Sequence, residues 1–120
     1  MKSSQDIIDI LNQATGTDCY HRFSPILGFP VITDGVLALA ETAGCFWFLD
    51  IIGSYQNNRK LDKEFQVWVL SVNMAEHSAV ARGYSDTVLI IEQQIPYTDF
   101  PLEELKLYLI DGVILLPSEY

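Results

Sequence analysis

The residues best suited to acid–base chemistry lie in and beside one apolar stretch, GCFWFLDIIGSYQ at residues 44–56. Asp50 is the only charged residue in it, and Trp47 and Ser54 lie close by in sequence. A carboxylate held in an apolar pocket can act as an active-site acid. His21 adds an imidazole that could titrate near neutral pH. One hypothesis is therefore a small enzyme or ligand-binding domain with a pocket around Asp50, Trp47, Ser54 and His21.

The periodicity of the same stretch favours a structural role for Asp50. On a helix, Asp50 and Ser54 share one side, and the opposite face collects large apolar residues, namely Phe48, Ile51, Ile52 and Tyr55. On a strand, Asp50 would lie among apolar side chains, which is a costly place for an unpaired carboxylate. We therefore predict a helix with Asp50 at the border of the core. No GxSxG motif supports a triad of Ser54, His21 and Asp50.

Metal, cofactor and nucleotide chemistry find little support in the sequence. Cys19 and Cys45 are too few and too far apart for a disulfide framework or a zinc motif. Cys19 and His21 could supply two metal ligands, whereas structural zinc takes four. The glycines are scattered and form no phosphate-binding loop. We expect no metal, no cofactor and no catalytic residue, and we expect His77 to lie in an exposed turn.

Charge is the strongest compositional signal. The chain has 16 acidic and 7 basic residues, a formal net charge of −9. Residues 61–120 carry −7 of it and residues 1–60 only −2. An acidic surface disfavours nucleic acid and suits either solubility or a basic partner. Asp99, Glu103 and Glu104 surround Pro101, where we predict a single helical turn whose N-terminus the acids stabilise. The alternative is that these acids dock a basic partner.

Two further helices and one short strand are predicted in the first half. Ser3 to Asp6 resembles a helix cap, the residues after it have helical spacing, and Gly16 would end the helix. A strand at 19–23 and a loop at 24–30 follow. Thr33 or Asp34 would then cap a second helix that stops at Gly44.

The sequence of the second half predicts β-strands. β-branched and aromatic residues mark them at 65–72, 79–84, 87–95, 105–110 and 113–116, with Gly83 to Asp86 between the second and third. Asp111-Gly112 is a two-residue hairpin signal, and Trp68 should be core. The sum is one α+β domain, residues 1–120, with N-terminal helices packed on an antiparallel sheet of about five strands. The longest uncharged apolar run, 43–49, is too short for a membrane span, and the first residues do not suit a signal peptide. We expect a cytoplasmic protein.

Three segments resemble a known family: TDGVLALAETAGCFWFLDIIGSYQ, FQVWVLSV and QIPYTDFPLEELKLYLIDGVILLPSEY. Together they are similar to a small bacterial domain family of unknown function, known from genomes and mobile elements. The resemblance covers roughly residues 15–120, and IPYTDFPL and LLPSEY are its most specific parts. It implies an α+β fold and a role tied to plasmids, phages or their hosts. It implies no reaction and no ligand.

We therefore expect a non-enzymatic domain that binds another macromolecule. Its acidic C-terminal half, with Asp99, Glu103 and Glu104, would contact a basic protein partner and neither nucleic acid nor membrane. The sharper hypothesis is an accessory or inhibitor protein of a phage or plasmid. Its carboxylates would occupy the phosphate positions of a nucleic-acid-binding protein. A third hypothesis is a homodimer formed through an exposed strand edge or apolar patch.

Overall fold

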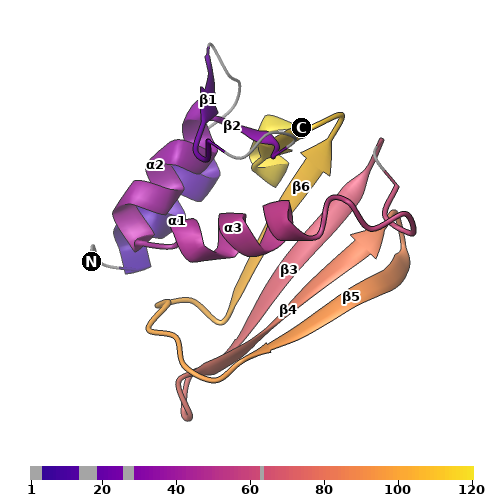
Figure 1. Cartoon of the computed structure of the whole chain (residues 1–120). Helices are drawn as coiled ribbons and strands as arrows, with labels where there is room; N and C mark the ends of the chain where they lie inside the picture. Colours follow the sequence, from indigo (N-terminus) through magenta and orange to yellow (C-terminus); the bar gives the residue numbers. More distant parts are fainter. Residues whose placement is uncertain (1–3, 14–18, 26–28, 63) are drawn as a thin grey trace.

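The fold is α+β, with three α-helices and seven strands in the part of the chain that the structure describes (Figure 1). The structure is a computed structural model that describes residues 4–13, 19–25, 29–62 and 64–120. The helices are α1 (Ser4–Gln13), α2 (Asp34–Ala43), α3 (Phe46–Ser54) and the short 3-10 helix η1 (Pro117–Glu119). The strands are β1 (Tyr20–Arg22), β2 (Val31–Thr33), β3 (Gln66–Asn73), β4 (Ser78–Ser85), β5 (Val88–Ile95), β6 (Glu104–Ile110) and β7 (Val113–Leu115).

One sheet holds all seven strands, in the order β1-β2-β7-β6-β3-β4-β5. The predicted α+β class is confirmed, but the sheet has seven strands rather than about five, and β2 and β7 pair in parallel. The strand that the sequence did not predict is β2. It has only three residues, too few for an alternating pattern. It is fixed by pairing with β7, beside which Val31 N donates to Gly112 O at 3.0 Å.

Both ends of α2 lie where the sequence predicted them. Thr33 is the N-cap, and its Oγ1 accepts a hydrogen bond from Val36 N at 3.2 Å. Gly44 ends the helix in the left-handed conformation, with φ of 66°, and its N–H donates to Ala40 O. For the first helix, the predicted cap residue Ser3 and stop residue Gly16 lie outside the described residues.

The predicted amphipathic helix at Asp50 is confirmed as α3. Phe48 and Ile52 are fully buried, whereas Asp50 and Ser54 are exposed on the other side. Asp50 therefore borders the core without entering it. None of the described helices combines the length and apolarity needed to cross a bilayer.

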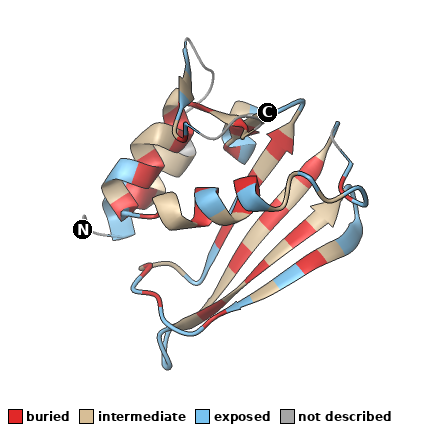
Figure 2. Cartoon of the chain, in the orientation of Figure 1, coloured by how far each residue is buried: buried red, intermediate tan, exposed pale blue. Residues whose placement is uncertain are grey.

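The described helices lie on one face of the sheet. Figure 1 shows α3 lying across β6 and β3, with α1 and α2 beside it. Burial alternates along the strands accordingly (Figure 2). In β3, Trp68 and Leu70 are fully buried, whereas Val67 and Val69 are only half-buried. We call the side that carries Val67 and Val69 the uncovered face.

The predicted core position of Trp68 is confirmed. Its Nε1 donates to Gln66 Oε1 at 2.9 Å. The amides of Gln66 and Gln56 bond each other in both directions, at 2.8 and 2.9 Å, and Gln66 Nε2 also donates to Asp62 O. Among the described residues, no buried side-chain nitrogen or oxygen lacks a partner. Burial of Gln66 therefore leaves no polar group unsatisfied.

The two hairpin predictions have different outcomes. Asp111 and Gly112 have φ of 49° and 82°, so the predicted two-residue turn with positive φ at both positions is confirmed. The expected break at Gly83 to Asp86 is too long, because β4 continues to Ser85. The turn is Asp86-Thr87, with φ of 56° at Asp86. Gly83 is a strand residue that lies against Trp68.

Candidate functional site

The predicted acidic residues lie at one end of the sheet, where β3 and β5 end and β4 and β6 begin. Two backbone hydrogen bonds hold the β5–β6 loop at this end, one from β3 and one to the β3–β4 turn. Val72 N donates to Glu103 O at 2.8 Å, and Thr98 N donates to His77 O at 2.7 Å. Turn and loop are therefore held to one another. His77 is exposed in the turn, as predicted, with φ of 56°.

The predicted helical turn at residues 98–104 is wrong. The loop runs without helix from Pro96 to Glu103. Thr98 Oγ1 accepts from Phe100 N at 3.1 Å, and the buried Phe100 ring anchors the loop in the core. This local side-chain bond satisfies the backbone in place of a helix. Stabilisation of a helix N-terminus therefore does not explain the acids here.

Four exposed carboxylates occupy this end of the sheet. Asp99, Glu103 and Glu104 are exposed there, as the sequence suggested. Glu76 joins them from the β3–β4 turn, where its N–H donates to Asn73 Oδ1 at 3.2 Å. No lysine or arginine occurs in residues 71–81 or 93–105. We call Glu76, Asp99, Glu103 and Glu104 the acidic end.

The acidic end borders the uncovered face through Glu104. Cross-strand pairing aligns the exposed side chains of β6, β3 and β4 in rows. One row is Glu104, Ser71 and Val80, and the next is Lys106, Val69 and Arg82. A shallow hollow of about 460 Å³ lies over these strands, between Glu104 and Tyr84. The surface beside the acidic end is therefore part apolar and part charged.

Arg82 does not neutralise the acidic end. Its Nε donates to Glu92 Oε2 at 2.9 Å across β4 and β5, and its guanidinium also reaches Ser71 Oγ at 3.5 Å. This ion pair leaves no net charge at its own position. Both side chains are partly exposed, so the pair contributes at most about 1 kcal/mol to stability.

The four residues of the alternative pocket have different surroundings in the structure. Asp50 and Ser54 lie on the exposed side of α3, and Ser54 Oγ donates to Ile51 O at 2.7 Å. Trp47 packs against Phe48, with ring centroids 6.0 Å apart. Among the described residues, no hydrogen bond or ion pair joins any two of Asp50, Trp47, Ser54 and His21.

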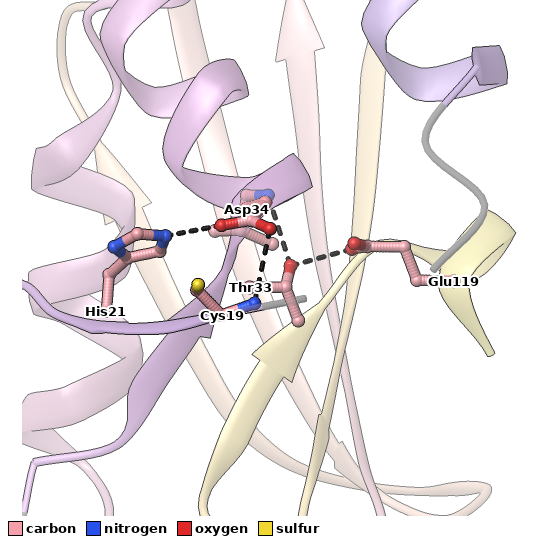
Figure 3. A network of polar contacts seen from close by, with 6 residues as sticks. Cys19, His21, Thr33, Asp34 and Glu119 are labelled. Atoms are coloured by element: carbon pink, nitrogen blue, oxygen red, sulfur yellow. Dashed lines mark hydrogen bonds and ion pairs between the residues drawn. The ribbon is translucent and has the colours of Figure 1, made fainter. Parts of the chain in front are cut away.

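His21 belongs instead to a polar network at the start of α2 (Figure 3). Its Nε2 lies 2.5 Å from Asp34 Oδ1, while Asp34 Oδ2 accepts from Cys19 N at 3.3 Å. Thr33 Oγ1 donates to Glu119 Oε1 at 2.7 Å, which ties η1 to the cap of α2. The sequence predicted the Thr33 cap but not the partners from β1 and η1, because these depend on the sheet topology.

The network has the composition of a metal or thiol site but not its arrangement. In the described part of the chain, no three His, Cys, Asp or Glu side chains group as metal ligands. Figure 3 shows His21 directed at Asp34, whose second oxygen accepts from the backbone N–H of Cys19. The hydrogen bonds of this network join β1, α2 and η1, and they stabilise the packing of these elements on one another.

Comparison with known proteins identifies the family but no activity. Residues 5–120 match the model of a family of unknown function, DUF6876. The match spans almost the whole chain, which therefore belongs to this family. No curated protein and no solved structure matches the chain.

Proposed function

We propose that this member of a family of unknown function is a non-enzymatic binding domain whose acidic end contacts a basic protein. The observation that carries the proposal is the set of four exposed carboxylates on the β3–β4 turn, the β5–β6 loop and the start of β6, where backbone hydrogen bonds fix the loop to β3 and to the turn. A fixed cluster of like charge attracts a complementary surface and orients it during encounter.

The construction of the loop supports binding over a purely structural role. Asp99 and Glu103 cap no helix, and Phe100 between them anchors the backbone in the core. Their carboxylates are therefore presented on a supported loop. A partner that binds there loses little free energy to ordering of this surface.

The uncovered face supplies the apolar contact that acids alone lack. Specific interfaces combine a less polar centre with a charged periphery. On this face, the half-buried side chains of Val69, Val80 and Tyr84 offer such a centre. Lys106 on the same face would fix the orientation of the bound partner, because the partner must place an acidic residue opposite it.

In its sharper form, the proposal makes the partner a nucleic-acid-binding protein. Carboxylates of the acidic end would take the positions of phosphates. The net charge of −9 suits a basic partner, although it is small for a mimic of nucleic acid. The domain would then act in the cytoplasm as an accessory or inhibitor protein of a phage or plasmid.

Affinity capture from host lysate tests the proposal. The wild type is compared with the triple variant Asp99→Asn, Glu103→Gln, Glu104→Gln at low and at physiological ionic strength. A matched control, Glu41→Gln, Asp50→Asn, Glu64→Gln, removes the same charge from exposed positions outside the acidic end. We expect a basic protein that the wild type and the control capture and the triple variant loses. Equal capture of every protein by all three forms at both salt concentrations contradicts the proposal.

A further inference from the structure

β5 is a long outer strand of the sheet. It pairs with β4 on one side and lies last in the strand order, with eight residues from Val88 to Ile95. The opposite outer strand, β1, has only three residues. An outer strand presents a row of backbone N–H and C=O groups that can pair with another strand.

Half of this edge lacks the usual protection against pairing. Soluble proteins guard outer strands with charges, prolines, bulges or short length. A bulge interrupts the β4–β5 register at Gly83/Tyr84, near the start of β5, but Ile91 to Ile95 pair regularly. Glu92 is the single charge in β5, and its ion pair with Arg82 weakens the protection that one carboxylate gives this edge without removing its charge.

Exposed apolar side chains mark both ends of β5. Val88 and Leu89 are 59% and 45% exposed at its start, and Tyr97, two residues beyond its end, is 68% exposed. When two copies of one strand pair antiparallel, the start of each lies beside the end of the other. A second copy is therefore an occupant whose apolar ends match those of this edge.

We propose that the protein forms a homodimer by antiparallel pairing of β5 with β5 of a second copy, centred on Gln93. Residues 91–95 read IEQQI, which is nearly the same in both directions. In this register Ile91 faces Ile95 of the second copy, and Glu92 faces its Gln94. Leu89 lies beside its Tyr97. A register centred on Glu92 would instead oppose two carboxylates, which is destabilising.

The dimer and the proposed partner contact respond to salt in opposite directions. Two chains of net charge −9 repel one another, so added salt strengthens the dimer. The same salt weakens attraction between the acidic end and a basic protein. Failure of one proposal is therefore distinguishable from failure of the other.

Sedimentation equilibrium of the full chain over a range of concentrations tests the dimer. Gln94 is exposed, so charge can be introduced there without disturbing the core. By symmetry each substitution acts twice against Glu92. We expect Gln94→Glu to weaken and Gln94→Lys to strengthen the dimer by roughly 2- to 30-fold in dissociation constant. Asn57→Asp and Asn57→Lys are matched controls, because Asn57 is exposed in the turn after α3.

Two results would overturn the proposal. One is a wild type that stays monomeric at every concentration up to about 1 mM at physiological salt. The other is a dimer whose dissociation constant changes no more with the Gln94 variants than with the Asn57 controls. That result would place the contact away from β5.

Discussion

Trp68 is held by three neighbours of different chemistry. Gln66 accepts its indole N–H, and Tyr55 stacks on it at a centroid distance of 6.1 Å and an interplanar angle of 27°. On the β4 side Gly83 offers no side chain, so the indole lies directly against the backbone. At the scale of single residues, Trp68 thus explains why β3 contains a buried glutamine, Gln66, and why β4 contains a glycine, Gly83.

The first prediction concerns Gly83. A Cβ added there would lie 2.7 Å from Trp68 Cη2, a distance that forces the indole to move. Gly83→Ala should therefore lower the free energy of unfolding by about 1–3 kcal/mol, measured by urea denaturation. In a Trp68→Leu background the methyl group has room, so the cost should shrink. An equal cost in both backgrounds would show that the indole is not the obstacle.

The second prediction concerns Cys45. Burial raises the pKa of its thiol from the usual 9.0 to about 12, although a backbone hydrogen bond opposes this. Above pH 9.0 the unfolded chain releases this proton and the folded chain keeps it. The stability contribution is therefore intact below that pH and is lost as the pH rises to about 12.

Urea denaturation across this range should show a wild-type stability that falls more steeply than that of Cys45→Ala. The difference should reach up to about 1.4 kcal/mol per pH unit, because other alkaline groups titrate in both proteins. Parallel pH profiles would contradict the assignment of the shift to Cys45.

At the scale of elements, the sequence predicted those features that depend on residues close together in the chain. Both ends of α2 were predicted correctly, because Thr33 and Gly44 form their capping hydrogen bonds with residues three or four positions away. β2 was missed because three residues carry no pattern, and its pairing with β7 spans about 80 positions in the chain. The loop after β5 was misread as a helical turn. Phe100 N donates to Thr98 Oγ1, and the buried Phe100 ring fixes the course of the loop.

The Asp111-Gly112 turn gives the third prediction. Both residues have positive φ, which a β-branched side chain strongly disfavours. Gly112→Val should lower the free energy of unfolding by about 1 kcal/mol or more. The control Gly112→Asn should lose less, because asparagine tolerates this conformation. Equal unfolding midpoints for the valine variant and the wild type would contradict the turn geometry.

At the scale of the whole molecule, one-sided covering of the sheet and uneven charge define the surface. The sequence predicted three of the four acids of the acidic end from their spacing around Pro101. Glu76 was missed because its place beside them depends on how the β3–β4 turn and the β5–β6 loop meet. The uncovered face could not be predicted, since alternation of polarity does not tell which side the helices cover.

The fourth prediction tests the central claim, that the acidic end contacts a basic protein. The measurement is the association rate constant of the captured partner, taken as a function of ionic strength for the wild type, the triple acidic-end variant and the matched control. The Debye length is about 10 Å at 0.1 M salt. The attraction between the acidic end and a basic protein should therefore weaken as the ionic strength rises from low to physiological.

We predict a rate constant that falls steeply with salt for the wild type and the control. The variant Asp99→Asn, Glu103→Gln, Glu104→Gln should show a lower rate at low salt and a much shallower slope. Its fold should persist, because all three side chains are exposed. Equal slopes for all three proteins would contradict the claim and leave the net charge of −9 as a contribution to solubility alone.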